Sequence, residues 1–540
     1  MLVMQLLLPF LCATAAAAAA IDSTSSSNGS DHHGSSFQAE CESFKAKINV
    51  ANANVHSVTY VPAGVNISMA DNPSICGGDE DPITSTFAFC RIALNVTTSS
   101  KSQIFMEAWL PSNYTGRFLS TGNGGLGGCV KYDDMAYAAG YGFATVGTNN
   151  GHFGNNGVSF YQNTEVVEDF AYRALHTGVV VGKELTKSFY PQGYNKSYYL
   201  GCSTGGRQGW KAVQTFPDDF DGIVAGAPAF NFINLTSWGA RFLTLTGNSS
   251  AETFVTETQW TAVHNEIIRQ CDSLDGAKDG IIEDPDLCQP IIETLLCNAT
   301  QSSTSGTCLT GAQVKTINGV FSATYGLNGS FLYPRMQPGS ELAAYSSYYS
   351  GTPFAYAEDW YRYVVFNNPN WDVATWTVQD AAIANAQDPY QISTWNGDLS
   401  PFQKKGGKVL HYHGMEDAII SSDSSKVYYK HVADTMNLSP SELDSFYRFF
   451  PISGMAHCAN ADGPSAIGQG TGTFAGNNPE DNVLLAMVQW VEEGVAPDFV
   501  RGAKLNGSTV EYRRKHCKYP KRNRYVGPGE YTDEDAWECV

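Results

Sequence analysis

The stretch SYYLGCSTGGRQGW, residues 197–210, decides the fold. Its first residues are typical of a buried strand and its last residues of a helix, with Gly201-x-Ser203-x-Gly205 at the junction. A serine at such a sharp strand-to-helix turn is lifted out of the sheet, where its hydroxyl can act as a nucleophile. The glycines are needed because side chains there would clash with neighbouring strands. We therefore expect Ser203 to be a catalytic nucleophile; an ordinary strand-helix turn is the alternative.

The segments around this turn alternate between strand and helix. GFATVGTN (142–149) and FDGIVAGAP (220–228) are typical of strands, whereas residues 168–190 and 206–216 have helical patterns. This rhythm predicts a mostly parallel sheet covered by helices. It breaks after residue 230, in a long region rich in Tyr, Trp and Phe, and resumes with the strand-like GKVLHYHG.

The sequence thus predicts an α/β-hydrolase fold whose catalytic domain is interrupted by a lid domain. A large insertion between the nucleophile and the catalytic acid would cover the C-terminal edge of the sheet, as lids do. The expected segments are a signal peptide at 1–20, the first part of the catalytic domain at 21–229, the lid domain at 230–401 and the second part of the catalytic domain at 402–540.

The first 20 residues, MLVMQLLLPFLCATAAAAAA, indicate secretion. An apolar core followed by small residues suits signal peptidase, although the stretch contains no Lys or Arg. A membrane anchor is the alternative, and the segment is short for one. Eleven Asn-x-Ser/Thr sequons also fit an extracellular surface that carries glycans. They lie at Asn28, Asn66, Asn95, Asn113, Asn195, Asn234, Asn248, Asn298, Asn328, Asn437 and Asn506.

Composition narrows the class of protein further. The formal net charge is -20, and the one basic run, RRKHCKYPKRNR (513–524), is short, so nucleic acid is not an expected partner. After residue 20, no run of consecutive apolar residues is long enough to span a membrane. The chain has 13 cysteines, and loss of Cys12 with the leader leaves an even number, as expected when all are oxidised outside the cell. Oligomeric state does not follow from the sequence.

A serine nucleophile needs a base that is itself oriented by an acid, in the chain order Ser, Asp/Glu, His on this fold. In VLHYHGMEDAIIS (409–421) a strand ends and Asp417 follows in the loop. Glu416 is the adjacent competitor, and Asp417 is favoured because His-Gly-x-x-Asp after a strand is familiar in this fold. His411 and His413 are better read as packed or loop-orienting residues than as metal ligands, since no third ligand is evident.

The base is expected in the loop PISGMAHCANADGP (451–464), which carries His457 followed directly by Cys458. Cys202 precedes Ser203 in the same way. These two cysteines can bond only if Ser203 and His457 are neighbours in space, which is what catalysis demands. We therefore expect a Cys202–Cys458 disulfide, whose closure stabilises the fold by on the order of 5 kcal/mol at most. Two unrelated structural cysteines are the alternative.

Together, GCSTGGRQG around Ser203, Asp417, His457-Cys458 and the large insertion resemble the fungal tannase and feruloyl esterase family. The resemblance covers essentially the whole mature chain and is strongest to feruloyl esterases of type B. It implies that Ser203 is the nucleophile, that His457 is the general base and then the acid, and that Asp417 orients His457. It also implies hydrolysis of phenolic-acid esters, such as feruloyl groups on plant cell-wall polysaccharide (xylan), through an acyl-enzyme.

Other functions remain open at this point. A sibling activity is the hydrolysis of gallate esters by a tannin acyl hydrolase. A serine peptidase of the same fold and residue order is a further alternative, although nothing in the sequence marks a pocket for a peptide end. A catalytically silent fold used for binding is disfavoured, because all three residue types of the triad are present in order.

The oxyanion of an acyl-transfer reaction needs preorganised N–H donors. Thr204, which follows the nucleophile, supplies one by position. The second is expected in the glycine-rich loop STGNGGLGGC (120–129), from the amide of Gly124 or Gly125. A flexible turn is the alternative interpretation of this loop.

A calcium site is expected in CDSLDGAKDGIIEDPDLC (271–288). Closely spaced carboxylates repel one another unless a hard cation neutralises them, and the spacing is not that of an EF-hand. A solvated acidic turn is the alternative. The resemblance implies a structural Ca²⁺ that holds the lid, and no organic cofactor. Its implied ligands are the side chains of Asp272, Asp275 and Asp279 and the backbone carbonyls of Ala277 and Ile281.

The remaining cysteines suggest local pairs, and the insertion carries many aromatic residues. The local pairs are Cys271–Cys288, Cys297–Cys308 and Cys517–Cys539, with Cys41, Cys76, Cys90 and Cys129 left for two bonds of undetermined connectivity. The aromatic residues could stack on a phenolic ring or form core. They include Tyr348, Tyr349, Tyr356, Trp360, Tyr361 and Tyr363.

Overall fold

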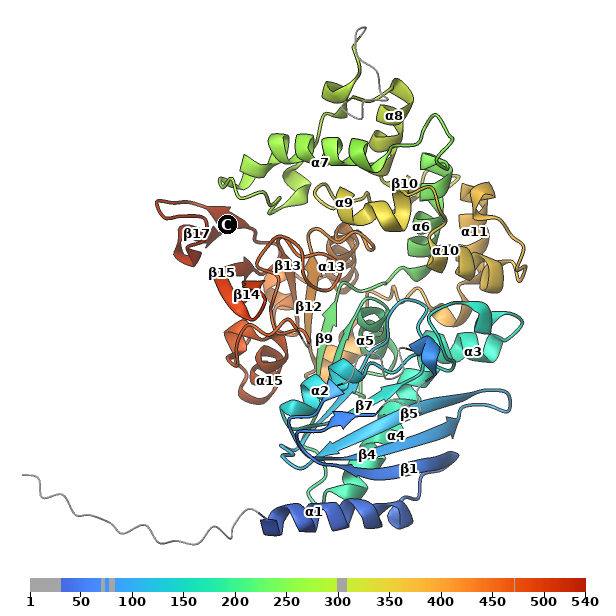
Figure 1. Ribbon diagram of the computed structural model, residues 1–540, viewed down its shortest axis with the longest axis vertical. Coiled ribbons are helices and arrows are strands. Elements are labelled where there is room, and N and C mark those ends of the chain that lie inside the picture. Colours follow the sequence, from blue (N-terminus) through green and yellow to red (C-terminus); the bar gives the residue numbers. More distant parts are fainter. Residues whose placement is uncertain (1–30, 69–72, 77–82, 299–307, 471) are drawn as a thin grey trace, which may run out of the picture.

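The computed structural model describes residues 31–68, 73–76, 83–298, 308–470 and 472–540. In this part of the chain a nine-stranded sheet forms the centre of the molecule (Figure 1). Its strands, in spatial order, are β1 (Ala53–Val61), β4 (Phe89–Thr97), β5 (Gln103–Pro111), β7 (Phe143–Thr148), β6 (Arg117–Thr121), β8 (Lys196–Cys202), β9 (Gly222–Gly226), β12 (Lys408–Gly414) and β13 (Tyr447–Ile452).

The strands from β7 to β13 run parallel, whereas β1, β4 and β5 pair antiparallel at one edge. Helices cross over between successive parallel strands, as this arrangement requires. The fold is thus the expected α/β-hydrolase type. Its helices are α1 (Asp31–Phe44), α2 (Tyr132–Gly140), α3 (Thr164–Glu168), α4 (Ala174–Phe189), α5 (Thr204–Thr215), α13 (Asp423–Met436), α14 (Pro440–Leu443) and α15 (Val483–Glu493).

Apolar residues of the parallel strands form part of two hydrophobic cores, one on each face of the sheet. On β8, Tyr199 joins the core that contains α4, α5 and α13, while its neighbours Tyr198 and Leu200 join the core under α2 and α15. Successive side chains of a strand point to opposite faces, so a strand buried on both sides is apolar throughout. This explains why SYYLG reads as an uninterrupted apolar run.

The insertion lies between β9 and β12 and folds into helices with a core of their own. Figure 1 shows its α7 and α8 at the end of the molecule opposite α1 and β1. Its helices are α6 (Phe232–Thr246), α7 (Glu257–Cys271), α8 (Gly311–Val320), α9 (Glu341–Ala344), α10 (Ala355–Trp360), α11 (Val378–Gln387) and α12 (Ser400–Lys404), and its small hairpin is β10 (Thr324–Tyr325) with β11 (Phe331–Tyr333). A role as a lid stays a prediction.

Most aromatic residues of the insertion are core. Tyr349 stacks on Trp260 with ring centroids 4.5 Å apart, and Tyr348 packs on Phe242. Trp360 lies in a second cluster that includes residues of the sheet-bearing part. Of the six aromatic residues singled out in the sequence, Tyr348, Tyr349, Trp360 and Tyr361 are buried, whereas Tyr356 and Tyr363 are partly exposed.

Six disulfides lie within the described residues. The expected local pairs Cys271–Cys288, Cys297–Cys308 and Cys517–Cys539 are present. The connectivity that the sequence left open is Cys41–Cys90 and Cys76–Cys129. The first ties α1 to β4, and the second fastens the glycine-rich loop after β6. The C-terminal disulfide closes a region of two hairpins, β14 (Phe499–Asn506) with β15 (Thr509–Cys517) and β16 (Asn523–Tyr525) with β17 (Trp537–Cys539).

Two expectations about secretion meet the structure only in part. The signal peptide at 1–20 and the sequon at Asn28 lie outside the described residues. The asparagines of the other ten sequons are all exposed or partly exposed, as a glycan requires. Among the described helices, none is both long and apolar enough to cross a membrane.

Candidate active site

Ser203 lies at the turn between β8 and α5, in a backbone conformation with φ +65° and ψ -124°. Such a conformation is strained for a residue other than glycine and is typical of functional sites. The turn is tight: a Cβ added to Gly201 would lie 2.7 Å from the Tyr199 hydroxyl, and one added to Gly206 would lie 2.3 Å from the Gly226 carbonyl oxygen. The Ser203 amide donates to the same Gly226 carbonyl at 3.0 Å. Close packing therefore requires glycine on both sides of the serine.

The glycine-rich loop after β6 packs directly against this turn. A Cβ on Gly122 would lie 2.5 Å from Gly205 Cα, and the Thr204 hydroxyl donates to the Gly125 carbonyl at 2.6 Å. The Asn123 amide is engaged, since it donates to Gln208 Oε1 at 2.9 Å. In the described structure the amides of Thr204, Gly124 and Gly125 donate no hydrogen bond. The expected oxyanion donors are therefore unengaged.

Asp417 follows β12 and is fully buried, and its carboxylate accepts four hydrogen bonds. Oδ1 accepts from the amides of Ile419 at 2.8 Å and Ile420 at 2.9 Å. Oδ2 contacts His457 Nδ1 at 2.7 Å and His413 Nε2 at 3.1 Å. Burial alone would raise the pKa of Asp417, but the charge on His457 and the hydrogen bonds outweigh it and hold this pKa well below its usual range.

Glu416, the adjacent competitor, is in a different environment. It makes none of the hydrogen bonds to His457 or His413. Burial, and then the negative charges of Asp462 and Glu341, raise the pKa of Glu416 to about 8. Of the two carboxylates, Asp417 is the one hydrogen-bonded to His457, and its role as the acid of a triad stays a prediction.

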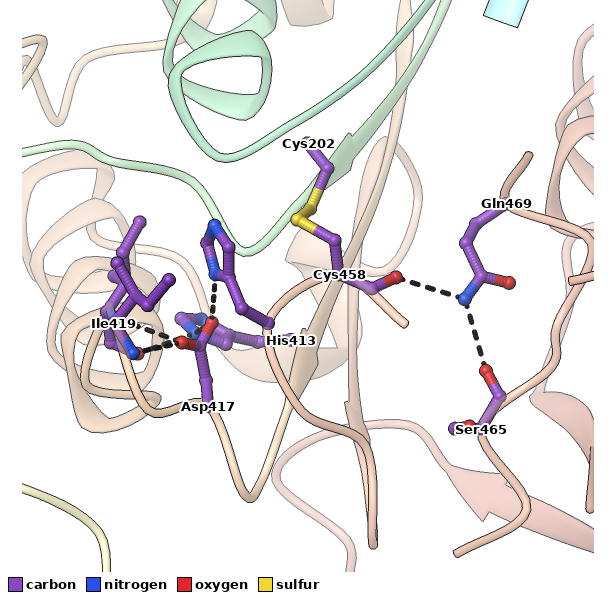
Figure 2. The surroundings of a disulfide bond; sticks show 9 residues. Cys202, His413, Asp417, Ile419, Cys458, Ser465 and Gln469 are labelled. Carbon is purple, nitrogen blue, oxygen red and sulfur yellow. Dashed lines mark hydrogen bonds and ion pairs between the residues drawn. A yellow bond between two sulfur atoms is a disulfide. The ribbon is translucent and has the colours of Figure 1, made fainter. Parts of the chain in front are cut away.

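His457 comes from the loop after β13, and the Cys202–Cys458 disulfide joins this loop to the Ser203 turn (Figure 2). The two Cα atoms are 6.1 Å apart. The Cys458 carbonyl also accepts from Gln469 Nε2 at 3.1 Å. Among the described residues no hydrogen bond joins the Ser203 hydroxyl to the His457 ring. Such contacts are often loose without substrate and tighten when it binds.

A cavity of about 780 Å³ opens beside Ser203 and His457. Its apolar wall comes mainly from the insertion and from the loop after Asp417, with Phe232, Leu235, Phe354, Tyr356, Ile419 and Ile420. Its polar wall comes from the sheet-bearing part, with Lys131, Asp133, Asp134, Gln469 and Thr473. Burial raises the pKa of Asp134 to about 6. Of the six aromatic residues singled out in the sequence, Tyr356 lines this cavity. No local pattern marks the other lining residues named here, because they converge from separate elements.

The expected calcium loop offers oxygen donors. The Asp275 Oδ1 atom accepts from the Ala277 amide at 2.8 Å, while its Oδ2 atom is buried without a hydrogen-bond partner. Burial raises the pKa of Asp275 to about 7. Asp272 accepts from the Gly280 amide, and Asp279 pairs with Arg514 at 2.7 Å. The unpartnered oxygen of Asp275 fits a hard cation, which prefers such ligands.

Side chains alone do not make a metal site here. Within the described residues no three His, Cys, Asp or Glu side chains gather closely enough to hold a metal ion. His411 and His413 are both buried and hydrogen-bonded to protein groups, in agreement with packed and loop-orienting roles.

Comparisons with known proteins agree with this geometry. The family described as tannase and feruloyl esterase matches residues 90–540. A probable feruloyl esterase B-1 of Aspergillus oryzae is 97% identical over 540 residues, which cover 100% of each chain. A probable feruloyl esterase B-1 of Neosartorya fischeri is 70% identical over 508 residues, 94% of this chain and 96% of the relative.

Comparisons with solved structures indicate the same family. The crystal structure of feruloyl esterase B from Aspergillus oryzae, 97% identical, has a TM-score of 0.93 and covers 93% of this chain and 100% of its own. Tannin acyl hydrolase from Aspergillus niger, 23% identical, shares the fold with a TM-score of 0.73 over 91% of this chain and 92% of its own. The resemblance inferred from the motifs is confirmed: this chain belongs to the tannase and feruloyl esterase family.

Proposed function

We propose that this protein is a serine esterase that hydrolyses esters of hydroxycinnamic acids, such as feruloyl groups on plant cell-wall polysaccharide. One observation carries the proposal: His457 Nδ1 lies 2.7 Å from the buried Asp417 carboxylate, in a loop that a disulfide joins to the Ser203 turn. The names of the relatives at 97% and 70% identity support the substrate class.

The proposed reaction proceeds through an acyl-enzyme. Ser203 gives its proton to His457 Nε2 and attacks the ester carbonyl carbon, and the amides of Thr204 and Gly124 or Gly125 stabilise the oxyanion. When the tetrahedral intermediate collapses, the bond to the alcohol breaks and His457 protonates the leaving oxygen. Water then repeats the sequence on the acyl-enzyme and releases the acid and free Ser203.

The cavity suits an aromatic acyl group. The ring would lie against Phe232, Phe354 and Tyr356, where aromatic side chains offer stacked or edge contacts. The polar wall would then face the alcohol part of the ester. A gallate ester would place more hydroxyl groups against the apolar wall, so hydroxycinnamate is favoured.

The test is release of acid from methyl ferulate and methyl gallate by the wild type and by Ser203→Ala. Loss of the nucleophile from such a triad lowers turnover by roughly a million-fold. Ferulate hydrolysis that disappears in the variant supports the proposal. Preference for gallate would move the enzyme to the tannin-directed side of the family, and activity on neither ester would overturn the proposal.

We further propose secretion and a structural calcium ion. The six disulfides within the described residues and the accessible sequon asparagines support an extracellular enzyme. The calcium ion would be held by Asp272, Asp275 and Asp279 with the carbonyls of Ala277 and Ile281, and the unpartnered Asp275 oxygen supports it. Recovery of the protein from the medium with an N-terminus near residue 21 would test secretion.

A further inference from the structure

A chain of buried polar side chains runs from Asp417 into the core of the molecule. Asp417 Oδ2 contacts His413 Nε2 at 3.1 Å, and His413 Nδ1 contacts the Ser425 hydroxyl at 2.6 Å. The Ser425 hydroxyl contacts His411 Nε2 at 2.9 Å, and His411 Nδ1 contacts the Tyr447 hydroxyl at 3.0 Å. All five side chains are fully buried, so water cannot substitute for any partner.

The protonation of His413 follows from its neighbours. Its Nε2 atom faces two acceptors, the Asp417 carboxylate and the Ile420 carbonyl oxygen at 3.1 Å. Neither group can donate a hydrogen bond, because the Asp417 carboxylate is ionised and a carbonyl oxygen carries no hydrogen. Nε2 of His413 therefore carries the proton. In the neutral ring Nδ1 is then an acceptor, and the Ser425 hydroxyl donates to it.

The rest of the chain follows from this first step. Because Ser425 has one hydrogen and directs it to His413, its oxygen accepts from His411 Nε2–H. His411 Nδ1 therefore carries no proton and accepts from the Tyr447 hydroxyl. Burial lowers the pKa of His411 well below its usual range, which agrees with a neutral ring.

A second proton on His413 would reverse every bond in the chain. His413 Nδ1–H would donate to Ser425, Ser425 to His411, and His411 to the Tyr447 oxygen. The Tyr447 hydroxyl would then have no acceptor, because His411 is its only hydrogen-bond partner in the described structure. A buried donor without an acceptor destabilises the folded state. The neutral ring is the state in which every N–H and O–H of the chain finds an acceptor.

We propose that His413 is a positioning residue for the catalytic acid, a neutral imidazole whose Nε2–H holds Asp417 Oδ2 in line with His457. This inference rests on the proposed role of Asp417. The two histidine rings share one carboxylate oxygen, while two backbone amides hold the other. The carboxylate can therefore neither rotate nor turn its charge wholly toward His457.

Few other titratable groups act on Asp417. The phenols of Tyr333 and Tyr348 are close enough to interact with it electrostatically, and burial keeps the pKa of each far above neutral pH. Tyr348 donates its hydrogen to the Ile419 carbonyl at 2.8 Å. The charge of Asp417 is thus balanced by N–H donors rather than by a permanent cation.

The test compares His413→Phe with His413→Gln on methyl ferulate. The phenylalanine variant keeps a ring but loses both nitrogens, so kcat should fall by about ten- to a hundredfold with KM unchanged. The acid limb of kcat/KM should move to higher pH, because Asp417 then attracts the proton on His457 more strongly. The glutamine variant retains an N–H donor, so its kcat and the pH of its acid limb should both lie close to those of the wild type.

His264→Phe is the matched control. His264 Nδ1 contacts the buried Glu341 carboxylate at 2.8 Å in the insertion, so this variant also removes a histidine donor from a buried carboxylate. It should lower stability and leave kcat and the acid limb unchanged. A His413→Phe enzyme with the kcat and the acid limb of the wild type would overturn the inference.

A second measurement needs no variant. A neutron diffraction structure of the wild type should show deuterium on His413 Nε2 and none on Nδ1, with the Ser425 deuterium directed at His413. Deuterium on Nδ1 would overturn the inference even if His413→Phe failed to fold. Failure of the proposed function looks different: wild type would not cleave methyl ferulate, or Ser203→Ala would still cleave it.

Discussion

Cys202 and Cys458 form a disulfide across 256 residues of sequence, and each is the immediate neighbour of a residue of the proposed triad. The bond therefore restrains the distance between the backbone of Ser203 and the backbone of His457. Gln469 adds a hydrogen bond to the Cys458 carbonyl, so the base loop is held on two sides (Figure 2).

Removal of this bond should impair both stability and catalysis. We expect Cys202→Ala/Cys458→Ala to lose on the order of 5 kcal/mol of stability at most, and to lose kcat because His457 is no longer held beside Ser203. Cys271→Ala/Cys288→Ala, which opens a loop of 17 residues, is the control and should lose about 3 kcal/mol while keeping kcat. Calorimetry and turnover on methyl ferulate measure both effects. Equal kcat values for the two double variants would contradict the prediction.

Asp417→Asn should lower kcat by about 10⁴-fold, because an amide presents the wrong hydrogen-bonding pattern to His457 and leaves the base in the wrong tautomer. Glu416→Gln should change kcat by much less, since Glu416 makes no hydrogen bond to His457. Steady-state rates at neutral pH distinguish the two neighbours. A larger loss in Glu416→Gln would reverse the assignment of the acid.

The raised pKa of Glu416 makes stability depend on pH. Its folded value of about 8 lies above its ordinary value of 4.5, so the folded state binds the proton more tightly. Stability should therefore fall as pH rises from about 4.5 to about 8, by at most about 1.4 kcal/mol per pH unit from this group. Glu416→Gln should raise Tm at pH 8 and change it little at pH 4.5. Glu511→Gln, at an exposed position, should change Tm little at either pH. A variant with the pH dependence of the wild type would refute this.

Calcium should stabilise the protein more at high pH than at low pH. Asp275, with a pKa near 7, must lose its proton before it can bind a cation. Excess calcium after chelation should therefore raise Tm more at pH 8 than at pH 6, and Asp275→Asn should reduce the gain at pH 8. Scanning calorimetry measures the effect. If calcium changed Tm at neither pH, the proposal of a structural calcium ion would be contradicted.

The parts of the site that could be predicted are those whose signal is local. The Ser203 turn depends on glycines within two residues of it, and the Cys202–Cys458 pair depends on cysteines next to the triad. The sequence predicts a packed or loop-orienting role for His413 but not its contact with Asp417. It depends on Ser425 and Tyr447 from other elements, and the packing that brings them together has no sequence pattern.

Two further features could not be predicted from the sequence, because they also depend on the packing of separate elements. The pairs Cys41–Cys90 and Cys76–Cys129 link elements about 50 residues apart, where several pairings satisfy the same spacing. The polar wall of the cavity depends on where α2 packs, since Asp134 lies on that helix. Long-range packing, rather than local propensity, decides both.

The disulfide next to the triad also has a consequence for biosynthesis. The ribosome releases Cys202 long before Cys458, and the cysteines at 271, 288, 297 and 308 emerge between them. The bond beside the nucleophile therefore cannot form until the whole insertion has been translated, and earlier oxidation of Cys202 would have to be reversed by exchange. A nascent chain that ends before this point therefore contains Ser203 but not its proposed base, His457.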